Sequence, residues 1–178
     1  MHNLATLLET IPDYAKDIKL NMASLLNNND GHLTAQQMAG VLYASALTTQ
    51  YQPLIKAVTQ SVEPMLDEQH IFAVKAATAI MAMNNIYYRF THLVSDPVYT
   101  TLPARLRMNV MANPGVDKLT FELYSMAVSV INGCGKCMDT HAVALEQQEL
   151  AKESVQACVR IAAVVNGLAQ VLIMEEVS

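Results

Sequence analysis

The chain has 178 residues, 52% of them hydrophobic, so it is long enough to bury one substantial core. Eleven Lys and Arg against sixteen Asp and Glu give a net charge of -5 without a basic cluster, which argues against nucleic acid or a membrane surface as a partner. The N-terminus has no secretory-signal pattern and the three cysteines are not the framework of a disulfide-stapled secreted domain, so we expect a cytoplasmic protein.

Apolar residues recur at helical spacing along nearly the whole chain, and no sustained alternation of period two is present. The expected fold class is therefore all-α. In the first half, Thr34 with Gln37 forms a capping box, which marks the start of a helix. The predicted helices there run from Pro12 to the turn at residues 27–31, from Thr34 to about Gln50, for a short stretch after Pro53, and from about Asp67 to His92.

The second half continues the helical pattern after Asp96-Pro97. Its predicted helices are a short one around Pro103 to Met111, one capped by Thr120 that ends near Asn132-Gly133, one that opens at the cysteines, and a long one from about Glu153 to Glu175. The most apolar segment, residues 161–174, falls short of the roughly 20 apolar residues that a membrane span needs. It is predicted to be a core helix.

A weak internal repeat divides the chain. Leu33-Thr34 and the Ala-rich segment 76–80 are echoed by Leu119-Thr120 and residues 158–163, with offsets of 86 and about 81 residues. This register pairs Gln36 with Glu122, Thr48 with Cys134, and Tyr51 with Cys137. We expect a single domain, 1–178, with a degenerate half at about 1–95 and a catalytic half at about 115–178. Alternatively, two amphipathic helical hairpins resemble one another through composition alone.

The segment around the cysteines is the most informative part of the sequence. Cys134, Cys137 and His141 are spaced at i, i+3 and i+7, so a helix places all three on one face. Two thiols at this spacing can close a disulfide and exchange it with a dithiol. Gly133 breaks the preceding helix, so the pair lies at a helix N-terminus, where the amides favour a thiolate. An imidazole one turn from Cys137 suits a general base.

Glu122 is a second candidate. It forms a narrow polar stripe with Ser125 and Ser129 on an otherwise apolar helix that leads to the cysteines. A buried carboxylate must be hydrogen-bonded, and beside His141 it would orient the ring and relay its proton. The alternative is a glutamate that is simply favoured by the dipole of its helix.

A metal site is the main rival interpretation of the cysteines. Cys134, Cys137 and His141 supply three zinc ligands, but only the distant Glu122 or Cys158 offers a fourth. Cys158 is more simply a small buried residue. A thioredoxin fold would need strands, and the pattern predicts none.

These residues resemble a known family. Glu122, the Cys134-Gly135-Lys136-Cys137 segment, His141 and the helix over 161–170 are similar to alkyl hydroperoxide reductase D (AhpD), of the carboxymuconolactone decarboxylase-like superfamily. The E-x11-C-x2-C-x3-H spacing is far more specific than C-x2-C alone, and the length also matches. Lys136 departs from the best-known member, which carries a histidine there.

The resemblance implies an AhpD-like fold of two related halves, with the active C-x2-C in the second half, assembled as a homotrimer. It implies an alkyl hydroperoxide reductase that passes electrons from dihydrolipoamide, carried on a dihydrolipoamide acyltransferase, to the peroxiredoxin AhpC or to a hydroperoxide, without a tightly bound cofactor. By this analogy Cys137 forms the sulfenic acid or mixed disulfide and Cys134 is the proton donor and resolving thiol. Glu122 and His141 form the proton relay.

Two other functions stay open on the sequence alone. One is a structural, zinc-binding helical module. The other is a non-redox enzyme of the same superfamily that acts on a lactone or carboxylate by proton transfer, whose activity would survive replacement of both cysteines by serine.

Overall fold

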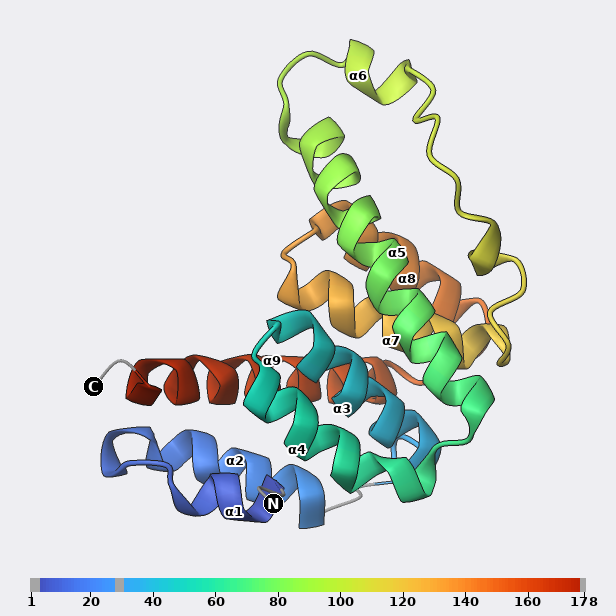
Figure 1. Cartoon of the computed structure of the whole chain (residues 1–178). Helices are drawn as coiled ribbons and strands as arrows, with labels where there is room; N and C mark the ends of the chain where they lie inside the picture. The colour runs from blue at the N-terminus through green and yellow to red at the C-terminus, as the bar shows by residue number, and fades with distance from the viewer. Residues whose placement is uncertain (1–3, 28–30, 177–178) are drawn as a thin grey trace.

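Helices make up every regular element of the computed structural model, which describes residues 4–27 and 31–176 (Figure 1). The predicted all-α class is confirmed. The elements are α1 (Leu4–Glu9), η1 (Asp13–Ala15), α2 (Lys16–Asn27), α3 (Ala35–Thr49), α4 (Gln52–Val62), η2 (Glu63–Met65), α5 (Glu68–Leu93), α6 (Val98–Thr101), η3 (Asn109–Met111), α7 (Lys118–Ile131), α8 (Gly135–Glu146) and α9 (Lys152–Glu176).

Side-chain caps fix where the main helices begin. The predicted capping box at α3 is confirmed, because Thr34 Oγ1 accepts from the Gln37 amide at 3.1 Å and the Gln37 side chain accepts from the Thr34 amide at 3.0 Å. The predicted cap of α7 was wrong. Asp117, with an extended backbone, caps that helix by accepting from the amide of Thr120 at 2.9 Å, and Thr120 is itself buried in the first turn.

The segment between α5 and α7 also differs from the prediction. The expected helix over 103–111 is replaced by the short α6 before it and the single turn η3 at its end. Leu102 precedes Pro103, which holds it in an extended conformation, and Arg105 has a left-handed φ of 52°. Near the N-terminus, α1 was not predicted. The expected turn there falls partly on residues 28–30, which lie outside the described residues.

Helix α7 is the centre of the fold and packs against α3, α5, α8 and α9. On its α3 side, the ring of Tyr124 lies where a side chain at Gly40 would stand, so Gly40 permits the close approach of the two helices. Helix α9 is long and apolar enough to cross a membrane, but half of its most apolar window is buried against the rest of the protein. Because it packs on α2, α3 and α7, it serves as a core helix, as the sequence indicated.

Three consecutive helices recur in order along the chain. α3, α4 and α5 begin at residues 35, 52 and 68, and α7, α8 and α9 begin at 118, 135 and 152. The offsets are therefore 83, 83 and 84 residues, in place of the expected 86 and 81. Counted from the helix starts, Tyr51 stands at the place of Cys134 and Leu54 at the place of Cys137, three residues from the expected pairing of Thr48 and Tyr51. The division into two halves with these boundaries stays a prediction.

The second half of α5, together with α6, projects away from the other helices (Figure 1). We call residues 86–104 the arm. Within the arm, the rings of Phe90 on α5 and Tyr99 on α6 make an edge-to-face contact, with their centroids 5.2 Å apart. Its large apolar side chains are exposed: Ile86, Phe90, Leu93, Val98, Tyr99 and Leu102.

Candidate active site

A sharp connection between α7 and α8 places the cysteines. Asn132 ends α7, and Gly133 has a left-handed φ of 68°, a conformation that residues other than glycine rarely adopt. Cys134 follows as the N-cap of α8, with its amide donating to the Ser129 carbonyl at 3.1 Å. Helix α8 therefore opens at the cysteines, as the sequence predicted.

Cys134 and Cys137 are joined in a disulfide, with Cα atoms 5.3 Å apart. Cys134 Sγ also accepts from the Cys137 amide at 3.3 Å, which is the contact of an N-cap side chain. Cys134 is fully buried, whereas Cys137 retains 6% of its surface. Cys137 is therefore the more accessible of the two sulfurs. The amide and helix N-terminus at Cys134 favour a negative charge on that sulfur when the bond opens.

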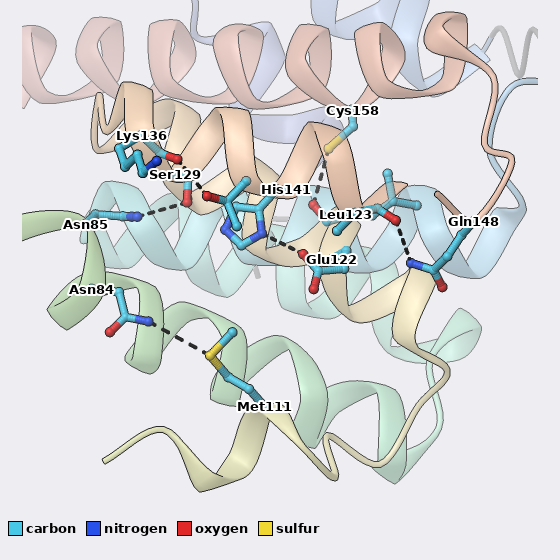
Figure 2. Close-up of polar contacts among 12 residues, drawn as sticks. Asn84, Asn85, Met111, Glu122, Leu123, Ser129, Lys136, His141, Gln148 and Cys158 are labelled. Atoms are coloured by element: carbon cyan, nitrogen blue, oxygen red, sulfur yellow. Dashed lines mark hydrogen bonds and ion pairs between the residues drawn. The ribbon is translucent and has the colours of Figure 1, made fainter. Parts of the chain in front are cut away.

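Glu122 and His141 form a buried pair between α7 and α8. Glu122 Oε2 lies 2.6 Å from His141 Nδ1, and the two residues are only 9% and 3% exposed. Because a carboxylate only accepts, Nδ1 donates, which leaves Nε2 as the free base of the ring. His141 Nε2 is buried and has no hydrogen-bond partner among the described residues. The structure thus brings all four predicted site residues together. Figure 2 shows the pair.

Polar groups from α5 hold the loop in front of the cysteines. Asn85, fully buried, donates to Ser129 Oγ at 2.9 Å and accepts from the Asn132 side chain at 3.0 Å. Arg89 donates to the Asn132 carbonyl at 2.6 Å. Figure 2 shows the Asn85–Ser129 bond, which joins α5 to α7. The sequence assigned no role to Asn85. The adjacent Asn84 and Asn85 in an otherwise apolar helix were the sequence feature that could have indicated a buried polar contact.

The three residues of the predicted polar stripe on α7 lie in three different environments. Glu122 binds His141 and Ser129 binds Asn85, whereas the Ser125 hydroxyl is buried without a partner in the described part of the chain. Lys136 is exposed and lines the pocket that opens onto Cys137 and His141.

A pocket of about 270 Å³ opens onto Cys137 and His141. Three methionines and Tyr88 form its apolar wall, with Asn84 among them, and we call it the Met pocket. Its lining comprises Met81, Asn84, Tyr88, Met108, Met111, Lys136, Cys137, Thr140 and His141. This wall could not be predicted from the sequence, because its residues come from α5 and the segment near η3.

The third cysteine is separate from this chemistry. Cys158 on α9 is fully buried and donates to the Leu123 carbonyl at 3.3 Å (Figure 2). Burial raises the pKa of the Cys158 thiol to about 12, so it stays protonated at neutral pH. The zinc interpretation needs two thiolates, and the sulfurs of Cys134 and Cys137 are bonded to each other instead. Across residues 4–27 and 31–176, no cluster of three His, Cys, Asp or Glu side chains suits a metal ion.

Comparison with known proteins supports the resemblance seen in the sequence. Residues 97–173 match the model of the carboxymuconolactone decarboxylase family. "Alkyl hydroperoxide reductase AhpD" of Coxiella burnetii (strain Dugway 5J108-111) is 54% identical over 97% of this chain and 98% of its own length. Proteins of the same name from Hyphomonas neptunium and Maricaulis maris are 51% and 48% identical, each over 97% of this chain and over 95% and 99% of their own lengths.

Proposed function

Because the chain belongs to the AhpD group of the carboxymuconolactone decarboxylase family, we propose that it is an alkyl hydroperoxide reductase that works through the Cys134–Cys137 dithiol. One observation carries the proposal. A redox-capable cysteine pair opens onto a pocket beside an imidazole whose second nitrogen is held by a buried carboxylate. Such a thiol, base and orienting group form the arrangement of an activated nucleophile.

We assign the oxidative steps as follows. His141 Nε2 takes the proton of the Cys137 thiol, and the thiolate attacks the terminal oxygen of the hydroperoxide. The O–O bond breaks, the alkoxide leaves with a proton as the alcohol, and Cys137 becomes a sulfenic acid. Cys134 then attacks the Cys137 sulfur, and hydroxide leaves with a proton as water. In total, two thiols and one hydroperoxide give one disulfide, one alcohol and one water.

Reduction of the disulfide requires an external dithiol. We propose dihydrolipoamide, carried on a dihydrolipoamide acyltransferase, as the electron donor. Its first sulfur attacks Cys137 and Cys134 leaves as a thiolate; its second sulfur then attacks the first and releases Cys137 as the substrate closes into a cyclic disulfide, and the two S–H protons pass to the two cysteines. Cys134 suits the leaving role because an amide and the N-terminus of α8 stabilise its negative charge. The sulfurs carry both electrons, so no tightly bound cofactor takes part.

The peroxiredoxin AhpC is the second proposed electron acceptor. In that reaction the Cys137 thiolate attacks the peroxiredoxin disulfide, and Cys134 resolves the mixed disulfide. The products are the reduced peroxiredoxin and the oxidised Cys134–Cys137 pair, so two electrons pass between the proteins.

A coupled assay tests this function directly. Oxidation of NADH is followed with lipoamide, lipoamide dehydrogenase and a hydroperoxide, with and without AhpC. We expect turnover that Cys137→Ser abolishes and that Cys158→Ala, the matched change at the buried cysteine, leaves near the wild-type rate. Wild-type turnover in Cys137→Ser would contradict the proposal. Activity on a lactone that survives loss of both cysteines would favour the non-redox alternative.

We further propose a homotrimer that buries the arm. The apolar side chains of the arm are exposed in the single chain, and an apolar surface of this kind favours association with another copy. Light scattering after gel filtration should give three times the mass of one chain. A double change, Phe90→Glu with Leu93→Glu, should lower that mass to one chain. Phe72→Glu, an exposed apolar site on α5 outside the arm, is the control and should keep the wild-type mass. A monomeric wild type would overturn the proposal.

A further inference from the structure

Two buried polar atoms beside the cysteines have no hydrogen-bond partner within residues 4–27 and 31–176. They are Asn84 Oδ1 and His141 Nε2, on residues that are only 4% and 3% exposed. Folded proteins leave few such atoms unsatisfied, so each one needs an explanation. Both residues line the Met pocket, Asn84 from α5 and His141 from α8. A hydrogen-bond donor brought in by a ligand of this pocket is the partner that we consider for these atoms.

The chemistry of these atoms restricts the ligand. His141 Nδ1 donates to Glu122, so Nε2 accepts. The Asn84 amide nitrogen points to the sulfur of Met111, at 3.9 Å, which leaves its oxygen as a second acceptor (Figure 2). A matching ligand therefore presents an O–H or S–H donor at the end that reaches Cys137.

The walls of the Met pocket restrict the rest of the ligand. Met81, Met108, Met111 and Tyr88 provide apolar and adaptable surface. With roughly 30 Å³ for each water-sized group, a volume of about 270 Å³ accommodates about nine non-hydrogen atoms. This is the size of the reacting end of a short unbranched chain, whose other end extends out of the pocket mouth.

We propose that Asn84 is a substrate-binding residue, which accepts a hydrogen bond from the reacting end of a short apolar substrate held in the Met pocket. This inference rests on the proposed function and deepens it. Two substrates share the chemistry: the dihydrolipoyl group, with an alkyl chain and S–H donors, and an alkyl hydroperoxide, with an alkyl chain and one O–H donor. In the dithiol, His141 Nε2 and Asn84 Oδ1 each accept from one S–H, and in the hydroperoxide Asn84 Oδ1 accepts from the single O–H with the terminal oxygen next to Cys137.

The assigned steps define what Asn84 does. For the dithiol, one S–H gives its proton to His141 Nε2 and its sulfur attacks Cys137, displacing Cys134 as a thiolate that takes up this proton. Asn84 binds the second S–H until it too gives its proton to His141 Nε2 and its sulfur attacks the first substrate sulfur, displacing Cys137, which takes up the second proton. The Cys134–Cys137 bond gains two electrons and the substrate closes into its disulfide. For the hydroperoxide, Asn84 binds the O–H and directs the terminal oxygen at the Cys137 thiolate.

The apolar part of the proposal is tested by binding without turnover. Octanoamide, which has the chain but no sulfur, is titrated into protein labelled with ¹³C at the methionine methyl groups. We expect shifts of Met81, Met108 and Met111, with Met22 in the core and Met65 on η2 unchanged as internal controls. Unchanged pocket methionines at millimolar octanoamide would overturn the pocket assignment, even in a protein that is active.

The role of Asn84 is tested by Asn84→Leu, which keeps the volume and removes the acceptor. The control is Asn109→Leu, the same change at an exposed site on η3 next to the pocket. Single-turnover rates are measured for reduction by dihydrolipoamide and by tris(2-carboxyethyl)phosphine, a reductant that has no S–H donor, and for oxidation by an n-alkyl hydroperoxide. Loss of one hydrogen bond predicts rates about tenfold lower with the two apolar substrates and within about twofold of wild type with the phosphine.

Each outcome decides the inference. A lower rate with only one apolar substrate assigns the pocket to that substrate. Unchanged rates with both, or an equal loss with the phosphine, would overturn the role of Asn84. If Asn84→Leu does not fold, Asn84→Ala replaces it. Wild-type protein that reacts with neither dihydrolipoamide nor hydroperoxide would defeat the proposed function, while the octanoamide titration would still decide on the pocket.

Discussion

Replacing Glu122 with glutamine removes one negative charge from the site and little else. Glutamine has nearly the same shape, and its carbonyl can still accept from His141 Nδ1. The tautomer of the ring is therefore retained, with Nε2 as the base. What is lost is the carboxylate charge, which stabilises the imidazolium that forms when His141 takes a thiol proton.

The size of the effect follows from the contact. The 2.6 Å bond is buried, and a hydrogen bond to a charged group contributes about 1.5–3 kcal/mol against about 0.5–1.5 kcal/mol for a neutral one. The difference of about 1–1.5 kcal/mol corresponds to a rate roughly 5- to 15-fold lower for Glu122→Gln. Glu122→Leu removes the whole bond, so its rate should fall by about 10- to 150-fold.

Single-turnover oxidation by an alkyl hydroperoxide measures these rates, with free thiols counted by alkylation and mass spectrometry after rapid quenching. Glu153→Gln, the same change at an exposed position of α9, is the control. The free energy of unfolding of Glu122→Gln should stay within about 1 kcal/mol of wild type, because relief of the buried charge offsets the weaker bond. A folded Glu122→Gln protein with a rate within twofold of wild type would refute the proton-relay role.

Three further predictions concern the scaffold. Gly40→Ala should lower the free energy of unfolding by about 1–3 kcal/mol in urea titrations, because the added carbon overlaps the ring of Tyr124, and an unchanged midpoint would contradict that packing. Asn85→Ala should lower the free energy of unfolding by about 1–3 kcal/mol in the same assay, because the Ser129 hydroxyl loses a buried partner. Stability equal to wild type would show that the Asn85–Ser129 bond does not stabilise the protein. Burial raises the pKa of Cys158 to about 12 from an ordinary value of 9.0, so the unfolded chain loses this proton first as the pH rises. The contribution of the protonated Cys158 thiol to the free energy of unfolding is complete below pH 9 and falls by about 1.4 kcal/mol per pH unit above it. Urea titrations at pH 8–11 should show this fall in the wild type and not in Cys158→Ala.

Local chemistry was enough to predict much of the fold. The capping box at Thr34, the extent of α5 from Asp67, the break at Gly133 and the long last helix all follow from residues near one another in sequence. One wrong prediction chose Thr120 over Asp117 as the cap of α7, and another concerns a segment with a weak local signal. In residues 103–111, apolar spacing suggested a helix, but the proline and the left-handed Arg105 give an irregular chain.

The sequence by itself also determined that Cys134, Cys137 and His141 share one face, because a single helix and its N-cap carry all three. The pairing of Glu122 with His141 was anticipated as a hypothesis, but it depends on how α7 packs against α8. The Met pocket and the place of Asn84 in it could not be predicted from the sequence, because α5 is brought to the cysteines across the core. Short-range spacing sets which side chains share a helix face, whereas contacts between helices depend on the packing of the whole core, and only the tertiary structure decides those.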